Sequence, residues 1–268
     1  MNLSFNPTAK DDVNLLHATH LIQDSTEVAS FLKNSGFEIL ELAEVSDAGN
    51  THCYRISLNG GYISFKKRNN SKILEFVDSA LTGFGLGTKD IESTQGRLTL
   101  HGFHPLSIEE RKLLFQVAKE ERREIAYKVF KLKKSDVLEG DVEFIDVSNS
   151  TKTSALSVHK NALSHFHAII LHTNKPEETI ARYCWLTDQS SPRRIFGSSW
   201  QVGLDQQKII VCSGEDVERI VPNVNISNLP SILGYALLTE SLSKTKDCFS
   251  HNELALQSLN RGSFLVKL

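Results

Sequence analysis

The sequence predicts an α+β or mixed α/β protein, with a small N-terminal unit of a hairpin and helices and a larger C-terminal unit built on a mixed sheet. Segments in which polar and apolar residues alternate are separated by segments with apolar residues at helical spacing. Asn59-Gly60 stands between two alternating segments, 53–58 and 61–65, and predicts a β-hairpin with a type I′ turn, in which both turn residues have positive φ. Hydrophobic residues make up 40% of the 268 residues and charged residues 23%, which excludes a collagen or a wholly disordered chain.

The expected N-terminal unit covers residues 1–100 and contains a helix before the hairpin. Asp24 and Glu27 have the spacing of a capping box, and the apolar stripe that follows can end at Gly36. Helical spacing predicts a second helix over 73–81.

A glycine string at Gly83, Gly85 and Gly87 is expected to close this second helix. A phosphate-binding glycine loop opens a helix after a strand, so a string placed after a helix favours a plain loop. A short strand over 97–100 should precede the boundary between the two units.

The expected C-terminal unit covers residues 101–268 and opens with the longest helix, 107–134. Ser107 and Glu110 form a capping box, and apolar residues follow at helical spacing. This segment holds nine Lys and Arg against five Glu, a basic excess in a chain whose formal net charge is −2.

The remainder should alternate between strands and short helices. Strands are expected over 142–147, 166–172, 194–203, 208–212 and 264–267, and helices from Pro176, from Glu215, from about Pro230 and over 252–260. No internal repeat is visible in the sequence.

Histidines provide the first candidate site. His165 and His167 lie two residues apart on an expected strand, so both imidazoles project from one face and can supply two ligands to a divalent metal ion. Asp146 or Glu143, on the preceding expected strand, could supply a carboxylate. This set would suit a metal-dependent hydrolase or nuclease; the alternative is a solvent-exposed strand edge.

Glu121 is the second unusual carboxylate, because it shares the expected helix face with Leu114 and Ile125. Burial of a carboxylate costs several kcal/mol unless it is paired or bound to metal. A salt bridge and an active-site acid are both compatible with this position. The usual nuclease pattern of Asp followed by Glu-x-Lys along a strand is absent.

Basic clusters provide the other candidate site. Lys66, Lys67 and Arg68 follow the hairpin, and Arg193 and Arg194 lie near an indole, Trp200. Paired cations near an aromatic ring are typical of a surface that contacts phosphates and stacks on bases.

These features predict a soluble binding protein that contacts nucleic acid through local basic surface. The alternatives are the metal-dependent hydrolase and an inhibitor or scaffold subunit with a protein partner; no motif decides whether the protein is an enzyme. Four cysteines without a CxxC pair and the absence of a signal peptide or long apolar run favour a reducing, cytoplasmic location and no membrane partner.

Overall fold

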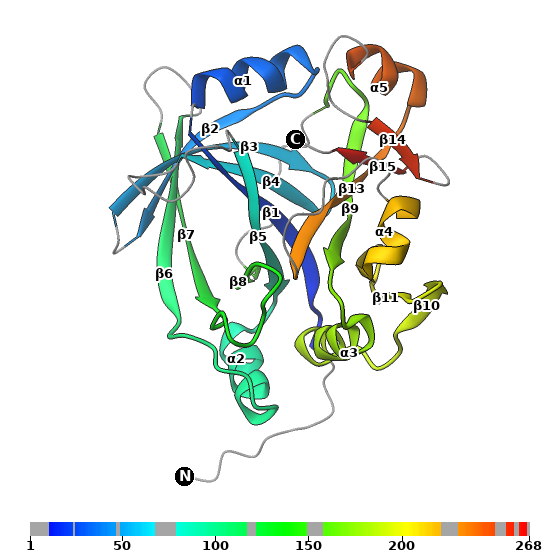
Figure 1. Ribbon diagram of the computed structural model, residues 1–268. Helices are drawn as coiled ribbons and strands as arrows, with labels where there is room; N and C mark the ends of the chain where they lie inside the picture. Colours follow the sequence, from blue (N-terminus) through cyan, green and yellow to red (C-terminus); the bar gives the residue numbers. More distant parts are fainter. Residues whose placement is uncertain are drawn as a thin grey trace.

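The computed structural model describes residues 11–23, 25–46, 49–67, 79–116, 122–148, 158–220, 230–249, 256–259 and 263–266. Two sheets lie side by side, with helices at both ends of the molecule (Figure 1). The helices are α1 (Ser25–Asn34), α2 (Ile91–Leu100), α3 (Pro176–Thr187), α4 (Gly214–Ile220) and α5 (Leu242–Phe249). In the described part of the chain, no helix is long and apolar enough to cross a membrane.

Eight strands of the first sheet close into a barrel. In pairing order they are β1 (Asn14–Ile22), β4 (Gly61–Lys67), β3 (Gly49–Leu58), β2 (Leu40–Ser46), β6 (Glu109–Gln116), β7 (Arg122–Lys131), β8 (Asp141–Asp146) and β5 (Ser79–Thr88), which returns to β1. Strands from both sides of residue 100 therefore pair in one barrel. A division of the chain at that residue stays a prediction.

The second sheet is open and has seven strands. In pairing order they are β10 (Arg193–Phe196), β11 (Ser199–Leu204), β12 (Gln207–Cys212), β9 (Leu163–His172), β13 (Ser231–Thr239), β15 (Ser263–Val266) and β14 (Leu256–Leu259). The mixed α and β content and the mixed sheet confirm the predicted fold class.

One structural unit, a strand, a helix and three strands, recurs along the chain. It comprises β1-α1-β2-β3-β4, then β5-α2-β6-β7-β8, then β9-α3-β10-β11-β12, and β13-α5 begins the same order again. In each complete unit the first strand runs parallel to the last. The copies share their order of elements and not a visible sequence pattern, so the repeat appears in the structure and not in the sequence.

Hydrophobic side chains pack on the outside of the barrel. Phe65, Phe84 and Phe144 alternate with residues that face inward, and each is fully buried. They belong to one apolar cluster that also contains Ile169 and Tyr235 of the second sheet. The main core therefore lies between the barrel wall, the second sheet and the helices.

The first helix and the hairpin are confirmed, but the turn type is not. α1 ends before Gly36, whose φ of +79° provides the left-handed conformation of a helix terminus. In the hairpin, Gly60 has positive φ and Asn59 does not. The Asn59 N–H donates to the Ser164 carbonyl at 2.7 Å, and its carbonyl accepts from the Phe166 N–H at 3.1 Å, so Asn59 continues as a strand toward β9.

The long helix expected over 107–134 is wrong, because this segment forms β6 and β7. The two strands pair antiparallel, with Arg111 opposite Tyr127. Charged residues on the inner barrel face interrupt the usual alternation of strands, and the remaining apolar residues fall by chance at helical spacing. Glu121 lies outside the described residues.

Other expected elements also differ. Residues 97–100 belong to α2 rather than a strand, Gly83, Gly85 and Gly87 lie within β5, and the segment after Pro230 is β13. Of the helix expected over 73–81, residues 73–78 lie outside the described part and 79–81 belong to β5. Of the helix expected over 252–260, residues 256–259 form the strand β14. The expected strands β8, β9, β11, β12 and β15 and the helices α3 and α4 are confirmed within a few residues.

Candidate functional site

Strand register brings polar and charged side chains together inside the barrel, beside buried apolar ones such as Leu42 and Val129. Tyr62 lies opposite His17 across the β1–β4 pair, and Gly85 lies opposite His17 on the other side. Directly paired residues in a sheet share a face, and the register of every neighbouring pair extends this face around the barrel. The resulting barrel cluster consists of His17, Glu44, Arg55, Tyr62, Lys66, Arg111, Tyr127 and Glu143.

Four charged residues of the barrel cluster form a buried ionic network, and a tyrosine hydroxyl joins it. The Arg111 guanidinium donates to Glu44 at 3.2 Å and to Glu143 at 3.1 Å, so it joins β6 to β2 and β8. The Lys66 Nζ lies 2.6 Å from the other oxygen of Glu44, and the Tyr127 hydroxyl donates to Glu44 at 2.7 Å. Arg111 also pairs with Glu109 toward the solvent.

Ion pairing keeps both glutamates charged despite their burial. Burial alone would raise the pKa of Glu44, but the charge and hydrogen bond of Lys66 lower it to about 2. The pKa of Glu143 is likewise held well below its ordinary value, against burial, by the hydrogen bond of His17 and the charge of Lys66. The interior therefore contains fixed charges of both signs.

His17 lies in a stack of groups across four neighbouring strands. Its ring is parallel to Tyr62 with centroids 4.9 Å apart, and the Arg55 guanidinium lies 3.7 Å from the Tyr62 centroid. The opposite neighbour is Gly85, where a Cβ would approach the His17 ring to 2.1 Å. The lack of a side chain at residue 85 therefore leaves the space that the imidazole occupies.

The imidazole of His17 has one partner and one unpartnered nitrogen. Its Nε2 lies 3.2 Å from the Glu143 carboxylate, whereas the buried Nδ1 has no hydrogen-bond partner among the described residues. Burial lowers the pKa of His17, so the ring is neutral near pH 7. An N–H on Nε2 facing the ionised Glu143 leaves the lone pair on Nδ1, which makes Nδ1 an acceptor.

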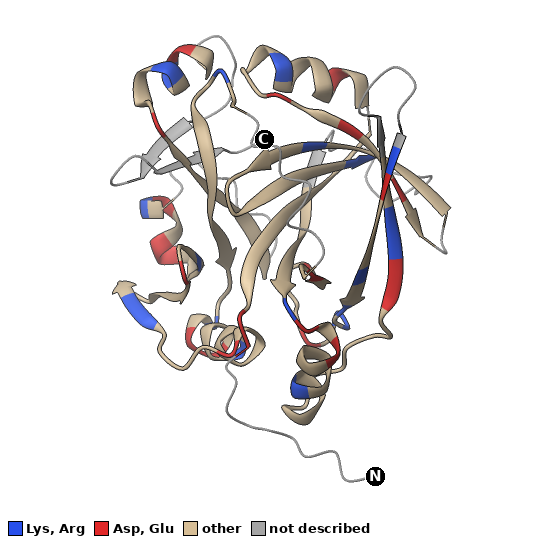
Figure 2. Ribbon diagram, turned by 180° about the vertical axis from the view of Figure 1, so that it is seen from behind, with Lys and Arg blue, Asp and Glu red and all other residues tan. Residues whose placement is uncertain are grey.

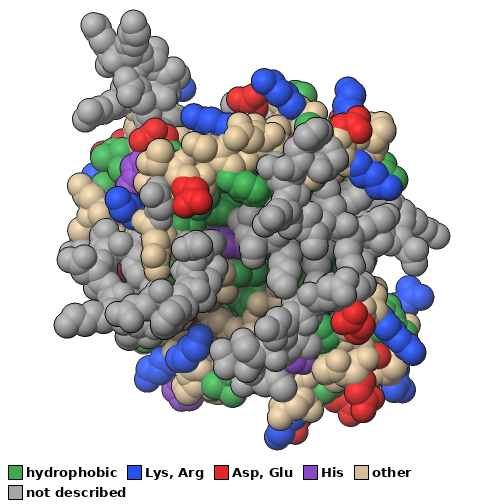
Figure 3. All heavy atoms as spheres, turned by 45° about the horizontal axis from the view of Figure 1, so that its top comes forward, with side chains coloured by type: hydrophobic (Ala, Val, Ile, Leu, Met, Phe, Trp, Pro, Cys, Tyr) green, Lys and Arg blue, Asp and Glu red, His purple; other side chains and the backbone are tan. Residues whose placement is uncertain are grey.

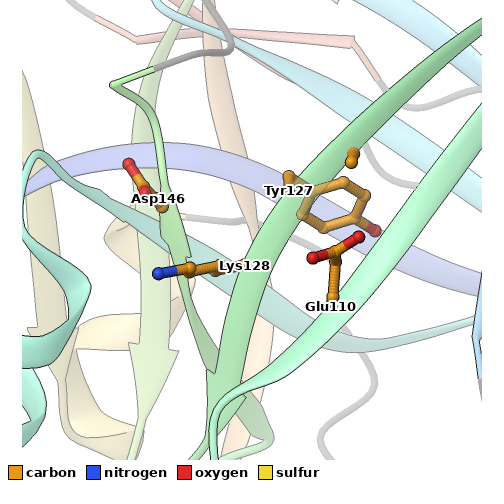
Figure 4. Close-up of a pocket in the computed structure, with 5 residues that line it drawn as sticks. Glu110, Tyr127, Lys128 and Asp146 are labelled. Carbon is orange, nitrogen blue, oxygen red and sulfur yellow. The ribbon is translucent and has the colours of Figure 1, made fainter.

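Two expected metal ligands lie on β9, and the third lies elsewhere. His165 is exposed and its Nδ1 is 2.8 Å from the Ser164 hydroxyl, while the His167 Nδ1 is 3.2 Å from the Gln206 carbonyl. Asp146 ends β8 on the barrel. There it lines an open cavity of about 210 Å³ with Glu110, Tyr127 and Lys128 (Figure 4). This cavity contains neither histidine.

Metal ligands are not assembled in the described residues. No three His, Cys, Asp or Glu side chains gather there in a set that could hold an ion. In the barrel, His17 and Glu143 are adjacent, but Gly85 supplies no side chain, and the cations Lys66 and Arg111 lie among the carboxylates. The barrel cluster therefore does not fit a resident metal ion.

The expected phosphate-binding residues are dispersed. Lys66 belongs to the barrel cluster, its neighbour Lys67 is exposed, and Arg68 lies outside the described part. Arg193 and Arg194 are exposed on β10, where the Arg194 guanidinium lies 6.0 Å from the ring of half-buried Trp200. Lys66 is thus enclosed by Glu44 rather than offered to a phosphate.

Charge is distributed unevenly between the two sheets. Lys, Arg, Asp and Glu mark several strands of the barrel, whereas β9 and β13 contain none of them (Figure 2). Sequence reasoning missed His17, Arg55 and Arg111. The usable signal was the alternation of β4, in which the polar residues Tyr62, Ser64 and Lys66 occupy every second position between apolar Ile63 and Phe65.

Comparison with known proteins places the fold. No family model matches the chain, and no curated protein sequence matches it. A hypothetical protein from Staphylococcus aureus has a similar structure, with a TM-score of 0.57 at 12% identity over 76% of this chain and 87% of that one. A mutant of 4-hydroxymandelate synthase from Streptomyces coelicolor gives a TM-score of 0.56 at 11% identity, over 93% of this chain and 77% of that one.

A fusion of a xylose isomerase-like TIM barrel with 4-hydroxyphenylpyruvate dioxygenase is also similar, with a TM-score of 0.58 at 12% identity. The match covers 95% of this chain and 41% of the fusion protein. Together with the recurring βαβββ unit, these likenesses show that the chain shares its fold with these structures. Identities this low establish the fold alone.

Proposed function

We propose that this protein binds a small polar organic molecule inside the β1–β8 barrel, through the barrel cluster. The observation that carries the proposal is the reversed polarity of the barrel, with phenylalanines packed outside and buried charges inside. Buried charges are costly for stability, and a wholly apolar interior of the same size is often more stable. Because a buried ionic network stabilises the fold less than apolar residues of the same size would, its presence inside the barrel favours a role in binding.

Unsatisfied polar atoms support the same proposal. His17 Nδ1 and Arg55 Nε are both buried, and in the described part of the chain neither has a hydrogen-bond partner. Most buried polar groups in proteins are paired, so an exception calls for an explanation such as a ligand. Both atoms belong to the stack that contains Tyr62.

The fold suggests metal binding, and two of the similar structures carry the names of a synthase and a dioxygenase. We propose that the barrel cluster of this chain acts without a resident metal, because its described donors are too few and are paired with cations. The pair of neutral His17 and ionised Glu143 can accept a proton at Nδ1, so acid–base chemistry on a bound molecule is available to this site.

The test is a fragment screen of small polar organic molecules, charged and neutral, followed by ¹⁵N NMR of the imidazoles. Binding in the barrel should shift the His17 signals and leave those of exposed His165 unchanged. A chelator should alter neither the His17 signals nor the thermal midpoint. Fragments that shift only His165, or a midpoint that falls on chelation and recovers with a divalent ion, would contradict the proposal.

A further inference from the structure

We infer that the molecule bound in the barrel is a small organic anion, held by Arg55, that also donates a hydrogen bond to His17. This inference rests on the proposed function and narrows its ligand class. Two features support it: Arg55 lacks the carboxylate partners that Lys66 and Arg111 have, and the Nδ1 of His17 is a hydrogen-bond acceptor.

Arg55 differs from the other two cations of the barrel cluster. Arg111 contacts Glu44, Glu143 and Glu109, and Lys66 contacts Glu44. No carboxylate pairs with Arg55 among the described residues, and its contact is the face of Tyr62. A guanidinium without a carboxylate partner in a partly buried position is the natural site for an anion.

Stacking on Tyr62 also fixes the orientation of the guanidinium. The Cζ of Arg55 lies 3.7 Å from the ring centroid, which holds the planar group against the ring and leaves its edge for in-plane hydrogen bonds. The buried Nε is one donor on this edge and has no partner. A planar carboxylate can accept from two such donors at once.

His17 supplies the second requirement. Glu143 holds the Nε2–H, so Nδ1 can accept a hydrogen bond but cannot donate one. Tyr62 contacts both His17 and Arg55, which brings the acceptor and the cation to a single aromatic ring. A matching molecule carries an anionic group and, nearby, an O–H or N–H, as a 2-hydroxy acid does.

Two matched series of probes test both requirements. Lactate is compared with propionate, which lacks the hydroxyl, and with lactamide, which lacks the charge; mandelate, phenylacetate and mandelamide repeat the comparison with an aromatic group. Dissociation constants are measured from the shift of the His17 imidazole signals. The hydroxy acid of at least one series should bind about tenfold or more tightly than either analogue, because each analogue leaves a buried polar group unpaired.

Variants assign the anion to Arg55. Arg55→Met should weaken binding of the hydroxy acid about tenfold or more and remove its preference over the amide, and Arg55→Lys should restore part of that preference. Arg193→Met removes an exposed cation on the other sheet. It should change neither the affinity for the hydroxy acid nor the preference for the acid over the amide. Retention of the wild-type acid-to-amide ratio by Arg55→Met would overturn the inference.

The outcomes separate the inference from the proposed function. Amides that bind as tightly as the acids and shift His17 would overturn the anion assignment and leave binding in the barrel established. If neither series shifts the His17 signals while neutral fragments of the wider screen do, the anion inference is wrong and the proposed binding in the barrel stands. If nothing in either set shifts His17, both fail.

Discussion

Gly85 determines where the imidazole of His17 can lie. A Cβ at residue 85 would lie 2.1 Å from the His17 Cε1 and 2.2 Å from its Nδ1. Contacts this short cannot exist, so any other residue here would force the ring away from Glu143. The glycine string of β5 thus makes room for side chains of neighbouring strands instead of binding phosphate.

Replacement of this glycine should be costly even by the smallest side chain. We expect Gly85→Ala to lower the free energy of unfolding by about 1–3 kcal/mol, the usual cost of overpacking. Gly96→Ala is the matched control, because nothing lies within 4 Å of its Cβ position in α2, and it should raise stability by about 0.5–1 kcal/mol. Urea unfolding measures both; equal effects would show that the His17 ring does not lie against Gly85.

His20 should make stability depend on pH. Burial lowers its pKa to about 3, whereas the unfolded chain keeps the ordinary value of about 6.5. As the pH falls below about 6.5, the unfolded state takes up a proton that the folded state does not, so this residue's contribution falls by about 1.4 kcal/mol per pH unit until about pH 3. We expect His20→Gln to have a shallower stability profile by that slope between pH 6 and pH 4.

The control for this measurement is His165→Gln, which removes an exposed imidazole of the other sheet. Its profile should run parallel to that of the wild-type protein. A profile of His20→Gln parallel to wild type would mean that His20 is protonated in both states or in neither. Urea midpoints across the pH range give the comparison.

The strands of the barrel depend on one another through the ionic network. Glu44 on β2 holds Lys66 of β4 and Arg111 of β6, so its loss leaves two buried cations with fewer partners. We expect Glu44→Gln to lower the free energy of unfolding by about 3–5 kcal/mol. Glu41→Gln, on the same strand but with a 70% exposed side chain paired with His52, should change it by about 1 kcal/mol or less. Similar losses for the two variants in urea unfolding would contradict a buried network.

Elements with strong local signals could be predicted from the sequence. The stripe before Gly36 gave α1, Asn59-Gly60 gave the hairpin, and Pro176 gave the start of α3. β6 and β7 could not be found in this way, because their inward faces carry charges that only pairing across the barrel explains. The type I′ turn failed for a related reason, since Asn59 pairs with a strand more than 100 residues away.

The candidate site was harder to predict than the fold. His17, Arg55 and Glu143 come from three strands far apart in the sequence, and only the closed register brings them together. The histidine pair on β9 attracted attention because it is local. Spacing along one strand cannot show what lies opposite, which is why His165 and His167 suggested a metal site that no described acid completes.

On the scale of the whole molecule, the two sheets are joined by specific hydrogen bonds as well as by the apolar core. The His20 ring of β1 lies 3.2 Å from the Tyr235 hydroxyl of β13. Buried Gln207 of β12 donates to the Gly60 carbonyl in the hairpin turn at 2.9 Å and to the Phe166 carbonyl of β9 at 3.0 Å. One face of the molecule is hollowed, and hydrophobic side chains lie in the hollow (Figure 3).

Gln207 provides a test of this connection. We expect Gln207→Ala to lower the free energy of unfolding by about 1–3 kcal/mol, because the buried Phe166 carbonyl and the partly buried Gly60 carbonyl lose a donor. Gln206→Ala is the matched control, since that neighbouring side chain is exposed, and it should stay within about 0.5 kcal/mol of wild type. Urea unfolding followed at Trp200 and at the His17 NMR signals should give coincident transitions in both variants. Separate transitions in the wild-type protein would show that the sheets unfold independently.

The reversed polarity of the barrel puts the apolar core packing on the outer face of the strands and the ionic network on their inner face. Phe65, Phe84 and Phe144 point away from the lumen, so these core residues are different from the inward residues that we propose to contact the ligand. A substitution inside the barrel that leaves the ionic network paired can therefore change the chemistry of the lumen without altering the outer apolar packing. The outer apolar packing is thus a scaffold on which the side chains of the lumen can vary.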